Sequence, residues 1–542
     1  MENLVNLLVQ QGVIKKPQGD ALIQQAEAEA AAANDAALMH APAPAPVPPP
    51  GTEAISAPNA GGAIRVTYIP ESVRQQLRDD IKQDVMKEAL AENWAAPDSV
   101  PAWTKSLRLT GDLRARVELD NFPSGNDPLG FPNFNAINRG SPYNASATNP
   151  NYPPFINVNE DRERPRLRAR VALDADLGEG FTAGIRIGTG NDDQPVSTNQ
   201  TLAADGLGSK YAIWLDRGFI KYNTSFDGTD MAFTIGRFDN PFFSTDLIWW
   251  SDLGFDGVVA QANHDFGRFR PFGTVGFFPV YNTDFNFSST QPEKYDSQDK
   301  WLAGAQLGTD IKIDKDLTMK VAAAYYDFIN TAGKLSDPLY NPSDDGSTDI
   351  LRPSFAQRGN TYMELRDNAY YTDPNSPYYG ENYQYYGLAT PYRELAFTGK
   401  LDYAHFDPFH IILDGEYVKN VAFDEARINA AVPQNNLDGS GRFDGGDTGW
   451  MVRLSLGDAV IEKRWDWQVC AAYKYIESDA VVDSFNDPDF GLGGTNLKGF
   501  IFGATVGLSK SVNIGFRWFS ADNVSAAPYS ADVFQLDLNA KF

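Results

Sequence analysis

Two stretches of the chain alternate between apolar and polar residues, and this pattern limits the folds that the sequence can adopt. From 106 to 119, apolar residues and one glycine occupy the odd positions, while polar residues occupy the even ones. A similar alternation runs from 164 to 177. A period of two residues is that of a β-strand with one apolar and one polar face. Both stretches exceed the usual soluble strand of about 5 to 6 residues, and about 9 to 11 tilted residues cross a bilayer.

The polar faces of these stretches are rich in arginine. Four arginines of the second stretch would share one face, which a soluble sheet would rarely allow unless water lay against it. An apolar outer face and a wet, basic inner face predict a transmembrane β-barrel. The fold class is therefore all-β, an antiparallel barrel of about 16 strands in residues 101–542. The inward, pore-lining basic residues are predicted to be Arg108, Arg114, Arg116, Arg164, Arg166, Arg168, Arg170 and Arg186.

The connections between alternating segments support the same fold. Long and short connections follow one another, and most short ones hold or adjoin Asp-Gly, Asp-Pro or Gly turn residues. Bacterial barrels show this alternation, with the short turns in the periplasm. A soluble β-sandwich or solenoid is the alternative, but such folds seldom alternate loop lengths so regularly.

Composition excludes several classes of protein. The chain has 46 basic and 71 acidic residues, a net charge of −25, which disfavours a nucleic-acid partner. Its one cysteine excludes a disulfide scaffold. We expect no cofactor and no bound metal: the acidic run 438–447 lacks the spacing of an EF-hand, so a solvated loop is favoured over a Ca²⁺ site. The four histidines do not accompany a nucleophile, so no catalytic residue is predicted.

The region before the barrel divides into three parts. Residues 1–36 are predicted to be a helical segment, 37–63 an Ala/Pro-rich linker, and 64–100 a periplasmic helix with its connector. The helix could lie near the pore mouth or join like helices in an oligomer, and both options stay open. No secretory signal is visible at the start, and we expect that an export signal has been removed or replaced.

Four stretches carry a family resemblance: 64–95, 107–118 (LRLTGDLRARVE), 236–242 (GRFDNPF) and the terminal Phe542. They resemble the bacterial putative-porin family, similar in architecture to sixteen-stranded general porins. The resemblance implies a water-filled channel for passive diffusion of small hydrophilic solutes across the outer membrane. It also implies a surrounding of outer-membrane lipid and lipopolysaccharide, and trimers are common among general porins.

The segment 236–259 follows the fifth predicted strand, and the loop at this place in general porins folds into the lumen. By this resemblance, the loop at about 239–254 narrows the pore, and its acids face the basic wall across a constriction with a transverse field. The alternative is a rim contact or subunit latch made by its aromatic residues. The predicted constriction residues are Asp239, Asp246, Asp252 and Asp256.

The C-terminal residues alternate back from a terminal phenylalanine. This resembles the last strand by which outer-membrane proteins are recognised by the barrel-assembly machinery. The predicted assembly signal consists of Phe534, Leu536, Leu538, Ala540 and Phe542.

Two other functions stay open at this point. The barrel could be a structural anchor, with residues 1–40 gripping peptidoglycan or a periplasmic partner. An outer-membrane enzyme is the second alternative, although no catalytic arrangement is evident at the outer ends of the strands.

The eight arginines generate a first testable prediction. If these arginines set the charge at the constriction, the channel should prefer anions although the protein as a whole is acidic. The reason is that charges farther away than a Debye length of ~8 Å are screened. In a planar bilayer under a salt gradient, the reversal potential should shift toward that of the anion. A shift toward that of the cation would contradict the prediction.

Overall fold

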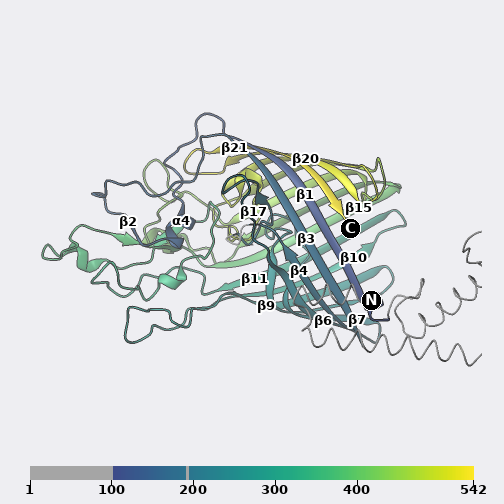
Figure 1. The fold of residues 1–542 in the computed structure, drawn as a ribbon, viewed down its shortest axis with the longest axis horizontal. Helices are drawn as coiled ribbons and strands as arrows, with labels where there is room; N and C mark the ends of the chain where they lie inside the picture. The colour runs from purple at the N-terminus through teal and green to yellow at the C-terminus, as the bar shows by residue number, and fades with distance from the viewer. Residues whose placement is uncertain (1–101, 191–193) are drawn as a thin grey trace, which may run out of the picture. The chain divides into compact units, whose positions relative to one another are not determined.

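The computed structural model describes residues 102–190 and 194–542. Sixteen long strands pair with their neighbours in antiparallel fashion, and β1 pairs with both β3 and β21, so the sheet closes into a barrel (Figure 1). These strands are β1 (Leu107–Asn121), β3 (Arg162–Gly178), β4 (Phe181–Gly188), β6 (Trp214–Phe226), β7 (Thr229–Asp239), β8 (Gly254–His264), β9 (Phe269–Tyr281), β10 (Lys300–Lys312), β11 (Leu317–Ile329), β15 (Tyr392–Phe406), β16 (Phe409–Asn420), β17 (Thr448–Asp458), β18 (Trp467–Ile476), β19 (Leu497–Gly507), β20 (Val512–Asn523) and β21 (Ser530–Lys541). The predicted barrel is confirmed.

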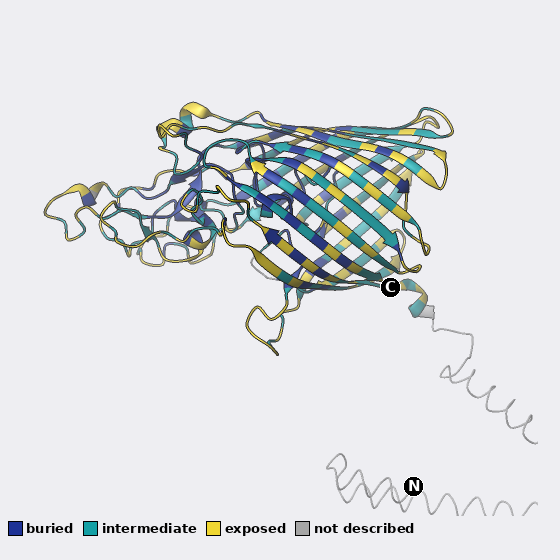
Figure 2. Ribbon diagram, turned by 90° about the horizontal axis from the view of Figure 1, so that it is seen from above, coloured by how far each residue is buried: buried dark blue, intermediate teal, exposed yellow. Residues whose placement is uncertain are grey.

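The alternation along the strands is that of a barrel in lipid. Leu109 is 63% exposed and lies opposite Leu173 in the register of β1 and β3, and both face outward. Arg166 and Arg168, on the other face of β3, are buried. Figure 2 shows the same alternation of exposed and covered residues along the strands of the barrel wall. The apolar face therefore meets the membrane, and the arginine face meets the lumen.

All seven short turns lie at one end of the barrel. Three of them use a glycine in the left-handed region: Gly180 (φ 89°), Gly228 (φ 74°) and Gly267 (φ 80°). Only glycine adopts this backbone region without strain, which explains the Gly-containing turns in the sequence. The C-terminus lies at this end, away from α4 and β2 (Figure 1). In bacterial barrels of known orientation, the short turns lie on the periplasmic side.

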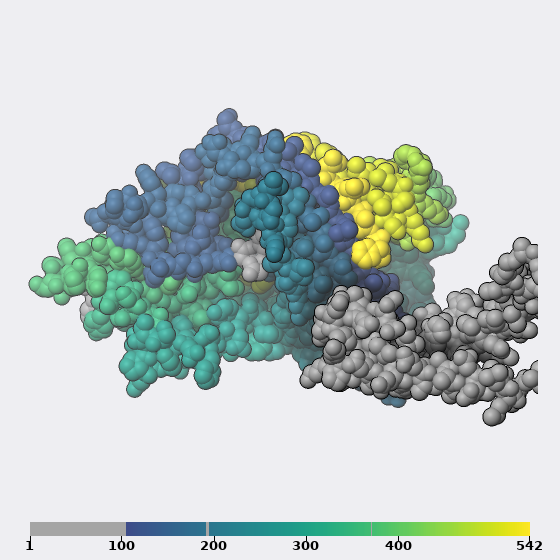
Figure 3. All heavy atoms as spheres, viewed as in Figure 1, coloured from purple at the N-terminus to yellow at the C-terminus, as the bar shows by residue number. Residues whose placement is uncertain are grey.

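The long loops at the other end carry small elements of their own. Figure 3 shows their atoms gathered into a mass beyond the strands. The strand β12 pairs with β14, and β13 pairs with β2. Among the described residues, no helix is long and apolar enough to span a bilayer. The small elements are η1 (Ala102–Ser106), α4 (Phe134–Arg139), β2 (Tyr143–Asn144), β5 (Gln200–Thr201), η2 (Asp349–Leu351), β12 (Tyr362–Glu364), η3 (Ala369–Thr372), β13 (Tyr383–Gln384), β14 (Tyr386–Leu388), α5 (Glu425–Ala430) and η4 (Phe490–Leu492).

The N-terminal predictions lie outside the described residues. This applies to the helical segment 1–36, the linker 37–63 and the periplasmic helix and connector 64–100, which all stay predictions. The alternative function as an envelope tether depends on the same residues.

The two faces of β1 generate a second prediction. Leu109→Arg puts a charge on the lipid face and should lower the free energy of unfolding by about 1 to 3 kcal/mol, since Arg costs about 2 to 4 kcal/mol at the bilayer midplane and less near its edge. The neighbouring Thr110→Arg puts the same charge at the same depth but on the lumen side, and should cost much less. Urea titrations of the two variants in lipid vesicles, followed by heat-modified gel mobility, measure the difference. Equal losses would contradict the assignment of the two faces.

Candidate pore and its inward loops

The connection between β7 and β8, residues 240–253, crosses the lumen. We call it the first inward loop. It leaves the wall at β7 and returns at β8, yet its middle contacts β16, β17 and β18. The strands β17 and β18 lie opposite β7 and β8 in the closed strand order. The loop therefore runs from the wall at β7 and β8 to the opposite wall.

Polar anchors hold the middle of this loop. The backbone N–H and the hydroxyl of Thr245 both donate to Glu416 Oε2, at 3.0 and 2.7 Å. Asp246 Oδ2 lies 3.4 Å from Arg453 Nη1, and its backbone carbonyl accepts from Lys474 Nζ. These wall residues satisfy polar groups of a loop that would otherwise be buried without partners.

The loop ends at the basic wall of β3. Asp252 Oδ1 lies 3.2 Å from Arg168 Nη1 and 2.9 Å from Arg170 Nη1. The hydroxyl of Thr198 donates to the other carboxylate oxygen, at 3.1 Å. Burial alone would raise the pKa of Asp252, but the two arginines outweigh it, and the pKa lies below its usual range. Asp252 is thus a charged anchor between the loop and the wall.

Aromatic side chains fill the space under the first inward loop. Phe242 contacts the ring of Tyr326 at 5.0 Å between centroids, and Trp249 contacts Phe255 and Tyr326 at 5.1 and 5.2 Å. Leu247 and Ile248 are fully buried. Part of the lumen therefore holds an apolar core, although the chemistry of the wall alone predicts a wet interior.

A second loop also enters the barrel, and the sequence reasoning did not find it. The connection between β18 and β19, residues 477–496, is buried almost throughout, and we call it the second inward loop. Its Phe485 carbonyl accepts from the backbone N–H of Trp250 at 2.9 Å, which joins the two loops in the lumen. Asp489 lies 3.2 Å from Arg116 Nη1 and 3.0 Å from Arg517 Nη2. The available signal was a run of acids among phenylalanines at 483–490, similar to the first inward loop.

Two acids of the second inward loop have opposite pKa shifts. Burial raises the pKa of Asp483 to about 7, because its hydrogen bonds are too few to balance the loss of water. Burial acts on Asp489 as well, but Arg116 and Arg517 outweigh it and hold the pKa below its usual range. The partners of each carboxylate thus decide its charge in this loop.

The structure places the predicted arginines on the lumen side of β1, β3 and β4, but most do not offer a free charge. Seven of the eight form ion pairs with carboxylates, and Arg108 forms none among the described residues. The acids are Asp112, Glu118, Asp120, Asp216, Asp239, Asp252, Asp489 and Asp537. The sequence analysis placed Asp239 and Asp252 near the basic wall but missed the other acids. Three of the missed acids, Asp112, Glu118 and Asp120, alternate with arginines on β1.

The four predicted constriction acids do not act as one set. Asp246 and Asp252 belong to the first inward loop, whereas Asp239 ends β7 and Asp256 lies within β8. Asp239 pairs with Arg217 and Asp256 with Arg237, at 2.7 and 2.6 Å. The loop acids touch the wall arginines directly, so the structure does not show the predicted open gap between them. The reason is that the loop crosses the whole lumen instead of stopping short of the wall.

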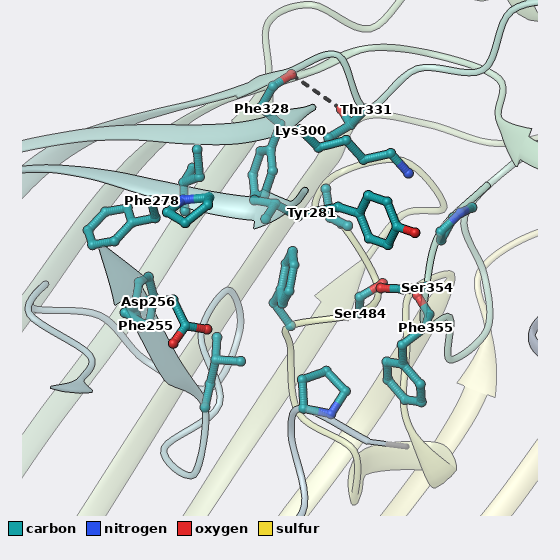
Figure 4. Close-up of a pocket in the computed structure, with 18 of the residues that line it drawn as sticks. Phe255, Asp256, Phe278, Tyr281, Lys300, Phe328, Thr331, Ser354, Phe355 and Ser484 are labelled. Carbon is teal, nitrogen blue, oxygen red and sulfur yellow. Dashed lines mark hydrogen bonds between the residues drawn. The ribbon is translucent and has the colours of Figure 1, made fainter. Parts of the chain in front are cut away.

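Two cavities flank the inward loops. The inner cavity, about 880 Å³, lies toward the short turns and has polar walls that include Lys221, Asn263, Gln306 and Lys320. A smaller pocket of about 180 Å³ lies toward the long loops, between the strand ends and the second inward loop. Figure 4 shows Phe255, Phe278 and Phe328 around it, with the Thr331 hydroxyl donating to the Phe328 carbonyl. The inner cavity is thus the polar one, and the smaller pocket is mainly aromatic.

The C-terminal strand β21 closes the barrel. Phe542 exchanges two backbone hydrogen bonds with Gly111 of β1, at 2.9 and 3.0 Å. Leu536, Leu538 and Phe542 are exposed on the lipid side, and Phe534 stacks on Trp518. Their predicted role as an assembly signal stays a prediction. Among residues 102–190 and 194–542, no three His, Cys, Asp or Glu side chains are grouped to hold a metal ion.

Comparison with protein families identifies the class of the chain. The family model described as "Putative porin" matches residues 1–542. The chain belongs to this family. It is therefore an outer-membrane protein of the channel class, in agreement with a barrel that is apolar outside and charged inside.

The chain is similar to several known structures at low identity. OprB of Pseudomonas putida has 10% identity and a TM-score of 0.42, with 81% of this chain and 95% of that chain covered. The outer-membrane channel DcaP of Acinetobacter baumannii has 10% identity and a TM-score of 0.37, with 80% and 97% covered. OmpF of Salmonella typhi has 10% identity and a TM-score of 0.36, with 80% and 97% covered. No curated protein matches the chain.

The anchor at Glu416 generates a third prediction. Glu416→Ala removes the acceptor of two hydrogen bonds from Thr245, so the opening free energy of the first inward loop should fall by about 2 to 4 kcal/mol. Hydrogen exchange of the peptides covering 240–253 should become faster, with no change in the strands. Glu425→Ala, at the exposed start of α5, is the control. Unchanged exchange of the loop in Glu416→Ala would show that this anchor does not hold it.

Proposed function

We propose that the protein is a passive channel for small hydrophilic solutes whose passage is narrowed by the two inward loops. The observation that carries this proposal is the first inward loop, which spans the lumen of a barrel with a charged inner wall. A family of porins supplies the channel class. The polar inner cavity and the packing of Leu247 and Ile248 across the lumen favour a narrow route over a wide general pore.

The charge pattern affects the proposed selectivity. Seven arginines of the wall have carboxylate partners within ion-pair distance, so the wall is a close array of opposite charges. Such an array orients dipolar solutes and gives a smaller net preference for anions than eight free arginines would. The predicted anion preference therefore stays a prediction, and its size depends on cations that lack a partner.

Assembly and surroundings belong to the same proposal. A trimer in outer-membrane lipid and lipopolysaccharide, inserted by the barrel-assembly machinery, is the expected state of the protein. Light scattering of the purified protein, corrected for detergent, measures the number of copies. A monomer in mild detergent would contradict the predicted trimer without affecting the channel itself.

The contact between the two inward loops generates a fourth prediction. The ring centroids of Trp249 and Phe485 lie 5.9 Å apart, and each ring occupies a large volume where the two loops meet. Replacing both by alanine removes aromatic volume where the loops meet, so single-channel conductance in planar bilayers should rise and larger sugars should enter proteoliposomes faster.

Trp465→Ala is the control for this experiment, because Trp465 lies in the exposed connection between β17 and β18. It should leave conductance unchanged. The proposal fails if the wild-type protein, shown to be folded by its heat-modified gel mobility, conducts no ions at all.

A further inference from the structure

Arg358 differs from the other buried arginines of this protein. It lies in the long loop between β11 and β15 and is 8% exposed. Its guanidinium carbon lies 3.6 Å from the ring centroid of Tyr529 and 5.2 Å from that of Phe131. Its Nη1 donates to the amide oxygen of Asn523 at 3.0 Å. No carboxylate among the described residues pairs with it, and its Nη2 has no hydrogen-bond partner there.

Other deeply buried arginines show what such a group ordinarily has. Arg116 pairs with Asp537 and Asp489, Arg217 pairs with Asp216, and Arg366 pairs with Asp349. A buried charge without a partner is costly, and buried donors are almost always satisfied. Among residues 102–190 and 194–542, Arg358 is therefore a buried cation without a carboxylate partner, which is the chemistry that an added anion would complement.

The surroundings of Arg358 match this reading. It lies in the wall shared by two cavities of about 500 and 210 Å³ at the long-loop end. We call the larger one the outer cavity. Three more arginines line it, and Asp120 is the one carboxylate among its lining residues. Asp120 Oδ2 pairs with Arg164 Nε at 2.8 Å, whereas Asp120 Oδ1 is buried and has no hydrogen-bond partner among the described residues. The additional arginines are Arg162, Arg164 and Arg166.

A second arginine that lines the outer cavity also has a buried N–H group without a partner among the described residues. Arg166 uses its Nη1 for Glu118 and its Nη2 for Ser197 and Asn199, but its Nε is buried and has no hydrogen-bond partner among the described residues. Neutral donors are also present, since the amide side chains of Asn135 and Asn157 line the same cavity. The cavity thus combines the guanidinium groups of four arginines with amide side chains, which is the donor set for an oxyanion.

We infer that the outer cavity is a binding site for a small oxyanion, a carboxylate or a phosphate, held mainly by Arg358. The planar guanidinium presents N–H donors in a fork that fits two oxygens of one anion. The rings of Tyr529 and Phe131 keep water from one side of the guanidinium and hold its plane. The inference deepens the proposed function, on which it rests, because it gives the channel a capture site for anionic solutes at its outer mouth.

The competing explanation is that Arg358 serves only to pack the loops. The stack on Tyr529 and the bond to Asn523 would then be its whole role, and a site for an anion would not exist. The two explanations differ in what a ligand does. An anion site responds to added oxyanion in a saturable way, and its response depends on the guanidinium, whereas a packing role has no such response.

The test is isothermal titration of the folded, detergent-solubilised full chain, in chloride buffer, with inorganic phosphate and separately with acetate. Both arms use the wild type, Arg358→Met and Arg358→Lys. Saturable binding is expected in the wild type for at least one probe. Affinity should fall roughly tenfold or more in Arg358→Met, because a hydrogen bond to a charged group is lost, and less in Arg358→Lys, which keeps the charge without the fork. The arm that saturates identifies the anion.

Two further variants keep the test decisive if Arg358→Met does not fold. Arg162→Met removes an exposed charge at the same cavity and should weaken binding several-fold. Arg442→Met is the matched control: this arginine is exposed in the loop between β16 and β17, pairs with Asp438, and should have no effect. Absence of saturable binding of either probe in the wild type, or equal affinity in all folded variants, overturns the inference.

The result is independent of conduction, so the two proposals fail separately. A wild type that conducts but binds neither probe refutes the anion site and leaves the channel. If the wild-type protein binds an anion but conducts no ions, the proposed channel is refuted, and the site belongs to a protein that binds anions without conducting them.

Discussion

The closure of the sheet between β1 and β21 is the constraint on which the rest of the structure depends. Within a bilayer, each backbone N–H and C=O must find a partner in the protein, and a closed barrel leaves no open edge. The register from Asp112 to Asn121 against β21 and the backbone pair between Gly111 and Phe542 supply that closure. Closure also fixes which residues face inward, because the side-chain period of a strand is two. The arginine face and the lumen are therefore consequences of the same register.

An enclosed lumen then sets a second requirement, which is charge balance. Inward arginines on β1, β3 and β4 are close together and partly covered by loops, so they would repel one another without acids beside them. Asp112 lies between Arg168 and Arg170, and Glu118 lies near Arg164 and Arg166. The inward loops add Asp252 and Asp489 to the same network. Wall arginines thus hold the inward loops in the lumen by ion pairs. In a pore without such loops, the same arginines would be free to attract ions.

The sequence was sufficient to predict the barrel architecture, but it was not sufficient to predict how the interior of the barrel is packed. The alternation from Leu107 to Leu119 and the turn residues predicted the strands, because lipid and water impose opposite demands on successive residues. The first inward loop was found only because its position between two strands resembled that of general porins. The second inward loop and the acids that pair with the arginines depend on contacts between residues far apart in the chain. Arg116 and Asp489, for example, are joined by the closed barrel and by nothing in their local sequence.

A buried arginine without a carboxylate beside it is an exception to this charge balance. Where the other buried arginines are matched by carboxylates, an arginine without one among residues 102–190 and 194–542 differs from the rule of this protein. Arg358 is held by aromatic rings and a neutral amide, which fix its position without neutralising its charge. Aromatic support of this kind preserves a cation for an incoming anion, whereas an aspartate in place of Asn523 would have satisfied it internally. The selectivity of this channel would then depend less on the number of arginines in its wall than on the few that have no carboxylate partner in the part of the chain that the structure describes.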